Sequence, residues 1–241
     1  QGESVRSPVI YLSGSSDMRN DLKGYGQANV IQNGRSEWKG YAPFYWNSFG
    51  VENVLGYSKV MMPPGVNKIS DFIYSLDNFN KYAKPVLSID SYDQNIYSAD
   101  VLTSLGKYGA ARNQQLGFYF IPFAVWTWKN TVEQTTLRGT GTPLREVVLK
   151  DKDHQPIAYK DGDWGAYAID PTHPAVRAYI ISQLQKAKAI NATFIKIDFL
   201  TAGALESTTR YDKRVRTGMQ AYNQGMRMLR SLVDSIMGPD I

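Results

Sequence analysis

Two charged side chains share one face of a short apolar segment near residue 196. In the segment Phe194-Ile-Lys-Ile-Asp198, strand geometry would put Phe194, Lys196 and Asp198 on one face and the aliphatic residues on the other. Buried charges are costly unless they are paired. This face therefore either meets water at a sheet edge or carries a functional site. A helix-like segment of the kind that covers a parallel sheet precedes the strand, so we favour the functional site.

Strand-like and helix-like segments alternate along the chain. A first strand is predicted to end near Trp46, and three more are predicted over 85–90, 117–125 and 193–200. Helical patterns cover 66–81, 99–115, 174–190 and 208–237. A long excursion at about 129–169 interrupts this order, and within it 145–150 and 156–160 flank a turn in a hairpin pattern. Strands that alternate with helices predict an α/β fold with a parallel sheet.

Polar and aromatic side chains gather where the predicted strands end. They are Asn47, Asp90 and Asp93, Trp126 and Trp128, Lys196 and Asp198. Such clustering at the carboxyl ends of successive parallel strands is typical of a (β/α)₈ TIM barrel. Only four strand–helix units are found. We therefore expect 41–241 to be the N-terminal half of a (β/α)₈ catalytic barrel and 1–40 to be a lead-in or connector from a preceding domain, with a complete four-stranded open sheet as the alternative.

Composition narrows the class of function. The net charge is +5, but no run of Lys or Arg forms a basic arm, so we expect no nucleic-acid partner. The longest apolar run, 118–126, is too short for a membrane span. No glycine-rich phosphate loop follows a strand, and His154 and His173 are not at metal-ligand spacing, so we expect neither cofactor nor metal. The 16 Tyr and 5 Trp offer flat apolar faces with polar rims, which suit sugars.

Five motifs, taken in order, resemble one enzyme group. The strand Lys196-Ile-Asp198 with its small-residue loop resembles the nucleophile strand of the α-galactosidase-like glycoside hydrolases of clan D, families 27 and 36. The other motifs are Tyr45-Trp-Asn-Ser-Phe-Gly50, Ile89-Asp-Ser-Tyr-Asp93, the strand 117–126 and the helix start 170–177. The match covers about 41–206.

The resemblance implies a (β/α)₈ barrel and retaining hydrolysis of a terminal α-linked sugar by double displacement. Asp198 would be the nucleophile, and Lys196 and Asp90 would bind sugar hydroxyls. Trp46 and Trp126 would line the pocket, with Asp93 and Trp128 as further substrate-binding residues. The acid/base carboxylate of this clan comes from a later strand, so we expect it outside this chain. The missing half of the barrel or an oligomer partner would supply it, and a secreted or periplasmic location is favoured by the resemblance.

The residues themselves agree with part of this scheme. A retaining glycosidase needs two carboxyl groups about 5 Å apart, one ionised and one protonated. Lys196, two residues from Asp198, would favour the ionised carboxylate. No acid partner stands out, although Asp93 is the residue to consider. The clan has an acidic pair that binds galactose hydroxyls where this chain has Asp90-Ser91, so a related sugar, or an inactive relative, stands as an alternative to galactose.

Two other functions stay open at this point. A lysine at a barrel strand end is also the chemistry of a Schiff-base lyase or aldolase, with Lys196 as the amine. A non-catalytic carbohydrate-binding relative would keep the aromatic residues without using Asp198 as a nucleophile.

Overall fold

The computed structural model describes residues 9–35, 43–82, 84–159, 163–239 and 241. The chain forms two compact units, Gln1–Ala42 and Pro43–Ile241, and each is described by itself. The predicted boundary between 40 and 41 lies outside the described residues, as does Lys160 at the end of the predicted hairpin.

Within the described residues 9–35 of the first unit there is one helix, α1 (Met18–Asn33). Its N-cap is Asp17, whose carboxylate accepts the backbone N–H of Arg19 at 3.0 Å. It ends at Gly34, which adopts the left-handed region with φ of +80°. None of the α1 residues is buried, so this helix contributes no hydrophobic core of its own.

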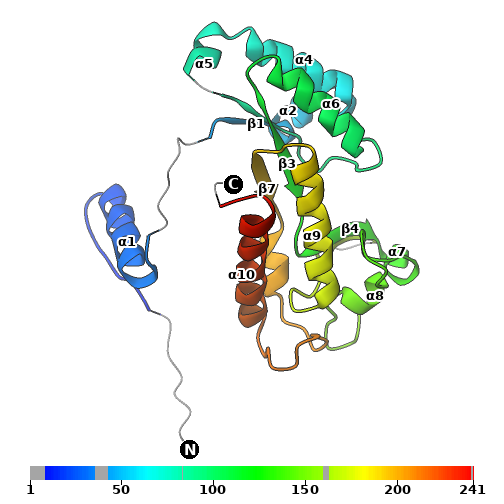
Figure 1. Ribbon diagram of the computed structural model, residues 1–241. Coiled ribbons are helices and arrows are strands. Elements are labelled where there is room, and N and C mark those ends of the chain that lie inside the picture. Colours follow the sequence, from blue (N-terminus) through cyan, green and yellow to red (C-terminus); the bar gives the residue numbers. More distant parts are fainter. Residues whose placement is uncertain (1–8, 36–42, 83, 160–162, 240) are drawn as a thin grey trace, which may run out of the picture. The chain divides into compact units, whose positions relative to one another are not determined.

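The second unit is built on a parallel sheet of four strands, namely β1 (Tyr45–Asn47), β2 (Val86–Ser88), β3 (Gln115–Phe120) and β7 (Phe194–Ile197). Their order in the sheet is β1-β2-β3-β7, so each strand pairs with the next one along the chain apart from the excursion between β3 and β7. This consecutive order is that of a (β/α) barrel, whereas a doubly wound sheet reverses its order. The predicted α/β fold with a parallel sheet is confirmed (Figure 1).

The sheet is curled. Neighbouring strands lie about 4.8 Å apart, so two strands separated by two others would be roughly three times that distance apart in a flat sheet. The rings of Tyr45 on β1 and Phe194 on β7 nevertheless stack with centroids 5.0 Å apart. The sheet therefore closes partly around its inner face, as a half-barrel does.

Helices cover the outer face of this sheet (Figure 1). The first strand is followed by α2 (Ser48–Leu55), α3 (Tyr57–Val60), α4 (Pro63–Tyr74) and α5 (Asp77–Tyr82), and the second by α6 (Ala99–Ala110). The helix α6 packs against the outer face of β2 and β3, since a Cβ at Gly106 would be in ordinary van der Waals contact with Leu116 at 3.5 Å and one at Gly109 with Leu87 at 3.4 Å. Leu87 and Leu116 therefore point outward, and residues of opposite parity point into the half-barrel.

The predicted helix over 66–81 is two helices, α4 and α5. The side-chain amide of Asn80 donates to the carbonyls of Ile73 and Tyr74, at 2.7 and 3.0 Å. These bonds satisfy carbonyls at the end of α4 that a continuing helix would have paired.

The predicted third strand over 117–125 is also divided. It ends at Phe120, because Pro122 has no backbone N–H with which to continue the ladder. A second, antiparallel sheet then begins with β4 (Ala124–Trp128), which pairs with β6 (Trp164–Ala168), and β6 pairs with β5 (Ala158–Tyr159). The excursion from the barrel thus starts at 124, before the predicted 129, and it holds α7 (Lys129–Gln134) and α8 (Leu144–Val147) as well.

The predicted hairpin lies inside this excursion but is shorter than expected. Lys150 and Pro156 form an antiparallel bridge, and the turn is closed by a hydrogen bond from the Asp151 N–H to the Gln155 carbonyl at 2.9 Å. Residues 144–147, predicted to begin the hairpin, are the helix α8 instead.

The last helix begins ten residues later than predicted. After α9 (Pro174–Ala189) and β7 come a 3₁₀ turn, η1 (Leu200–Ala204), and then α10 (Gly218–Ile236). A capping box between Thr217 and Gln220 sets the start of α10. The loop before α10 is bound to the excursion instead, since the Lys150 N–H donates to the hydroxyls of Ser207 and Thr209 at 3.1 and 3.2 Å.

Close packing of α10 on the excursion yields a stability prediction. A Cβ at Gly225 would lie 2.7 Å from Pro171 and 2.9 Å from Phe123, neither of which is a flexible side chain. We expect Gly225→Ala to lower the free energy of unfolding by about 1–3 kcal/mol in urea titrations. The control is Gly50→Ala in α2, where a Cβ meets nothing within 4 Å, and there the higher helix propensity of alanine should be neutral or stabilising. Equal effects would contradict the packing.

The start of α9 yields a pH prediction. The N-cap of α9 is His173, and its Nδ1 accepts the Ala175 N–H at 3.1 Å, which requires a neutral ring. Burial lowers the pKa of His173 below 6.5, opposed in part by Asp170 and Glu146. The unfolded chain therefore takes up the proton first, so the contribution of His173 is complete above about pH 6.5 and is lost as the pH falls below it.

The measurement is the urea midpoint as a function of pH. His173→Asn keeps an N-cap that does not titrate, so we expect its stability to fall less between pH 7 and pH 5 than that of the unaltered chain. His154→Asn, at the exposed turn of the hairpin, is the matched control and should leave the pH dependence unchanged. Parallel curves for the unaltered chain and His173→Asn would refute the assignment.

Candidate active site

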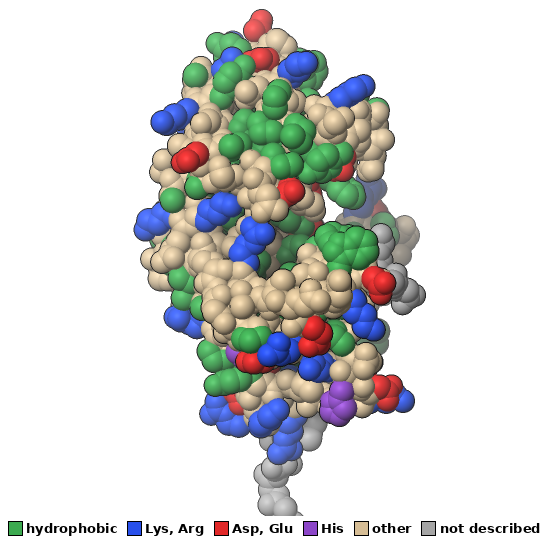
Figure 2. Space-filling model, turned by 90° about the vertical axis from the view of Figure 1, so that its right-hand side faces the viewer, with side chains coloured by type: hydrophobic (Ala, Val, Ile, Leu, Met, Phe, Trp, Pro, Cys, Tyr) green, Lys and Arg blue, Asp and Glu red, His purple; other side chains and the backbone are tan. Residues whose placement is uncertain are grey.

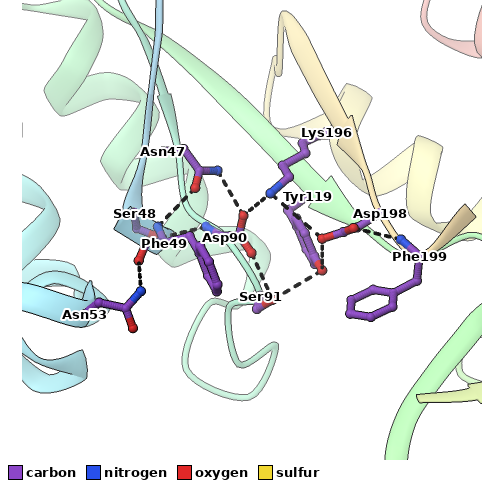
Figure 3. A network of polar contacts seen from close by, with 10 residues as sticks. All are labelled: Asn47, Ser48, Phe49, Asn53, Asp90, Ser91, Tyr119, Lys196, Asp198 and Phe199. Carbon is purple, nitrogen blue, oxygen red and sulfur yellow. Dashed lines mark hydrogen bonds and ion pairs between the residues drawn. The ribbon is translucent and has the colours of Figure 1, made fainter. Parts of the chain in front are cut away.

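Polar side chains from all four barrel strands meet at the carboxyl ends of those strands (Figure 3). Asn47 ends β1, Asp90 follows β2, Tyr119 lies in β3, and Lys196 lies in β7 just before Asp198. Tyr119 and Lys196 are paired across β3 and β7, and the ladder continues as the Asp198 N–H donates to the Phe120 carbonyl at 3.3 Å. The curl of the sheet brings these residues together, since β1 and β7 are not neighbours in it.

Lys196 links two carboxylates. Its ammonium forms an ion pair and hydrogen bond with Asp90 and lies 3.9 Å from the Asp198 carboxylate. The Asp90 side chain is only 3% exposed, whereas that of Asp198 is 36% exposed. A buried carboxylate is costly unless it is paired, so Lys196 compensates Asp90 while leaving Asp198 accessible from the inner face.

Asp90 is surrounded by donors. Besides Lys196, the side-chain amide of Asn47 donates to it at 3.0 Å and the Ser91 hydroxyl donates at 3.0 Å. Its own backbone N–H donates to the Ser48 hydroxyl at 2.8 Å. Both carboxylate oxygens are therefore occupied as acceptors, and Asp90 is held in place from β1, β2 and β7.

Asp198 is oriented by two donors. The Tyr119 hydroxyl donates to one carboxylate oxygen at 3.2 Å, and the Phe199 N–H donates to the other at 2.8 Å. Burial, together with the nearby charges of Asp198 and Asp90, raises the pKa of Tyr119, while a hydrogen bond from Ser91 works in the opposite direction. Tyr119 therefore stays a neutral phenol at physiological pH and remains a donor to Asp198.

The backbone takes a left-handed turn directly after each of the two aspartates. Ser91 has φ of +43°, and Phe199 has φ of +51° and ψ of +36°. This region costs an L-residue roughly 1–2 kcal/mol, and such residues concentrate at functional sites. At both positions the turn breaks the strand and leaves the preceding carboxylate at the mouth of the half-barrel.

The aromatic residues predicted for the pocket are distributed differently. Trp46 lies between Tyr45 and Asn47 in β1, so strand alternation directs it to the face opposite Asn47. Phe49, which the sequence reasoning missed, lies beside Asp90 and Ser91 (Figure 3) and is 60% exposed. The sequence feature that could have pointed to Phe49 is its position in the aromatic segment at the end of β1. Trp126 and Trp128 lie in β4, and the Trp126 ring contacts that of Phe199 at 5.5 Å.

Asp93 does not join the cluster. It is exposed, its carboxylate accepts the Asn95 N–H at 2.8 Å, and its carbonyl accepts from Ile96 and Tyr97. Asp93 therefore caps the turn that leads into α6. Glu206 is also engaged elsewhere, since it accepts the Gly218 N–H at 2.7 Å at the start of α10.

Metal-binding side chains and membrane-spanning helices both bear on the class of function. Over the described ranges, no group of three or more His, Asp or Glu side chains is arranged to hold a metal ion. None of the helices in the described part of the chain is both long enough and apolar enough to cross a bilayer.

Together, the curled parallel sheet and the carboxylates at its mouth have the architecture of half a (β/α) barrel. No protein-family model matches the chain. An α-galactosidase from Thermus thermophilus, solved with stachyose, is similar with a TM-score of 0.59 at 19% identity, over 83% of this chain and 40% of that one. An isomalto-dextranase from Arthrobacter globiformis, complexed with panose, gives 0.54 at 17%, over 85% and 35%.

A third solved structure, a β-L-arabinopyranosidase from Geobacillus stearothermophilus in complex with arabinose, gives a TM-score of 0.53 at 16% identity, over 84% of this chain and 48% of that one. At such identities the likeness concerns the fold. The predicted resemblance to the fold of α-galactosidase-like hydrolases is confirmed, and the chain spans 35–48% of the length of these three structures.

The pairing of Lys196 with Asp90 can be tested by a double-mutant cycle. Breaking a buried ion pair costs about 3–5 kcal/mol, and partial exposure of Lys196 reduces the expected loss to about 1–3 kcal/mol for Lys196→Met. Asp90→Asn in the same chain should restore part of this stability, because no buried charge then remains unpaired. Lys188→Met, on the exposed last turn of α9, is the control. A loss no larger than that of the control, measured by urea unfolding, would disprove the coupling.

Proposed function

We propose that this chain forms the N-terminal half of the catalytic barrel of a retaining glycosidase, with Asp198 as the nucleophile. The observation that carries the proposal is the contrast between the two aspartates. Asp90 is buried with both oxygens occupied, whereas Asp198 is exposed toward the inner face and is oriented by Tyr119 and the Phe199 N–H. An oriented carboxylate that is open on one side is suited to attack a carbon atom.

The reaction would run in two displacements. A carboxylate oxygen of Asp198 attacks the anomeric carbon of a terminal α-linked sugar, and a glycosyl ester forms as the bond to the leaving oxygen breaks. A second carboxyl group protonates that oxygen and then removes a proton from the water that hydrolyses the ester. Tyr119 and Lys196 hold Asp198 in position throughout, by a hydrogen bond and by charge.

The second carboxyl group is proposed to come from outside this chain. Of the acids considered, Asp90 has no free oxygen, Asp93 caps a turn, and Glu206 caps α10. The other half of the barrel, or a partner chain that takes its place, would supply the acid/base residue. The assembled protein would then close the barrel around the sugar.

Sugar hydroxyls would be bound by groups already at the mouth. Lys196 is the polar candidate, since Asp90 is buried with both oxygens occupied and serves to hold Lys196. Phe49 offers an exposed ring at the place assigned to Trp46 from the sequence. The hydroxyl of Ser91, where the clan has a second acid, lies within hydrogen-bond distance of Asp90 and of the Tyr119 hydroxyl, at 3.0 and 3.2 Å, so it serves the network as much as the sugar. A terminal galactose or a related sugar is proposed as the substrate.

The geometry argues against the Schiff-base alternative. The Lys196 nitrogen is bound to Asp90 and lies 3.9 Å from Asp198, so it is not free to attack a carbonyl carbon as such chemistry needs. A nucleic-acid function has no support either. On the face drawn in Figure 2, Lys and Arg side chains are dispersed among hydrophobic and other side chains and do not form one basic patch.

The nucleophile can be trapped without the acid/base residue. Fluoride leaves without protonation, so an activated fluorinated galactosyl fluoride should form a stable ester on Asp198 even in this chain alone. Peptide mapping by mass spectrometry is expected to find the adduct on the peptide that contains Asp198, and none in Asp198→Asn. Retained galactose binding with no adduct would instead support a non-catalytic carbohydrate-binding protein.

Turnover provides the complementary measurement. With nitrophenyl α-galactoside we expect no hydrolysis by this chain above the rate of Asp198→Asn, because the acid/base group is absent. Robust turnover would refute the half-barrel proposal and would require a second carboxyl group within the chain.

A further inference from the structure

The antiparallel sheet of the excursion carries aromatic side chains on one face. Trp128 lies directly opposite Trp164 in the β4–β6 register, and Trp126 and Tyr159 each lie opposite Ala166. Residues that are directly opposite, or two apart on one strand, project from the same side of a sheet. Trp126, Trp128, Trp164 and Tyr159 therefore share one face, which we call the aromatic face.

The other side of the same sheet belongs to the core. Thr127 and Tyr167, which alternate with the aromatic residues along β4 and β6, are 8% and 2% exposed. In a sheet with one buried face, the solvent-facing side normally carries polar residues. Here Trp128, Trp164 and Tyr159 are 54%, 44% and 64% exposed. Both tryptophans that are exposed in the described part of the chain lie on this face.

The aromatic face is continuous with the candidate active site. Phe199, the residue after Asp198, contacts Trp126 at 5.5 Å and Tyr159 at 5.7 Å between ring centroids. From Trp126 the row continues to Trp164 at 6.1 Å and from there to Trp128 at 5.2 Å. The row thus begins beside the proposed nucleophile and leads away from the mouth of the half-barrel.

Packing alone accounts for only part of this row. Trp126 is half-buried against Phe199, which is sufficient to anchor the sheet to the loop after β7. Trp128 and Trp164 add ring contacts with one another but keep about half of their surface in water. Exposed indole surface costs free energy, so a ligand that covers the rings of Trp128 and Trp164 would gain free energy of binding.

We propose that the aromatic face binds the second and further sugar units of a neutral oligosaccharide whose terminal sugar lies at Asp198. The apolar C–H faces of pyranose rings stack on aromatic side chains, and indole N–H and phenol O–H groups at the rims can bind hydroxyls. The successive rings, tilted by 36° and 55°, form a twisted surface that follows a chain of sugars. The proposal rests on the proposed function for the position of the terminal sugar.

The test compares chain lengths by isothermal titration calorimetry on the chain. The probes are galactose and two tetrasaccharides, stachyose and isomaltotetraose. We expect one tetrasaccharide to bind more tightly than galactose, and the double variant Trp128→Ala/Trp164→Ala to weaken that binding about tenfold while leaving galactose binding unchanged. Phe72→Ala, an exposed aromatic residue of α4 away from this face, is the matched control and should change neither affinity.

The outcomes separate this inference from the proposed function. In one outcome, an adduct forms on Asp198 but Trp128→Ala/Trp164→Ala does not change the tetrasaccharide affinities. That outcome refutes sugar binding by the aromatic face and leaves the proposed glycosidase function standing. In the converse outcome, binding depends on chain length and is abolished by the double variant, but no adduct forms. That outcome supports sugar binding by the aromatic face and refutes the proposed role of Asp198 as the nucleophile. Failure of the unaltered chain to bind either tetrasaccharide also overturns the inference. Urea midpoints of the variants check that each one is folded.

Discussion

The site depends on the position of one ammonium group between two carboxylates. Lys196 pairs with Asp90, which is buried, and lies 3.9 Å from Asp198, which is accessible. Neither β2 nor β7 would hold its charge alone, because a buried carboxylate needs a partner and a lysine on the inner face of a sheet needs the same. The two strands stabilise each other's charges across the curled sheet, and this ion pairing fixes the positions of the Asp90 and Asp198 carboxylates relative to one another.

The barrel curvature and the left-handed turns serve the same arrangement. Curling brings β1 close enough to β7 for Tyr45 to stack on Phe194. Asn47 joins the bonds around Asp90 from β1, which is the neighbour of β2 in the sheet. Beyond the strands, the turns at Ser91 and Phe199 end the ladder directly after each aspartate. The energy that these turns cost is offset by packing, most clearly at Phe199, whose ring is held by Trp126 and Tyr159.

The excursion between β3 and α9 links this site to a second surface. Its antiparallel sheet places one face in the core and turns the aromatic face outward, and Phe199 joins that face to the loop after β7. Conformational restraint of Phe199 by these rings would be passed directly to Asp198 through the Phe199 N–H that the carboxylate accepts. Binding along the aromatic face and chemistry at Asp198 would therefore share one structural element.

The sequence by itself determined the parallel α/β sheet and the placement of Lys196 and Asp198 on one face of its last strand, because strand alternation and residue type are local properties. It did not determine where elements end. The break at Pro122 and the start of α10 have local causes, the missing Pro122 N–H and the Thr217–Gln220 capping box, which the hydrophobic pattern does not reveal. The turn that Asp93 caps is local as well. Only the tertiary structure decided that Trp126 lies in a second sheet, that Asp90 is buried against Lys196, and that Phe49 rather than Trp46 stands beside the site, because these outcomes depend on contacts between segments that are far apart in the chain.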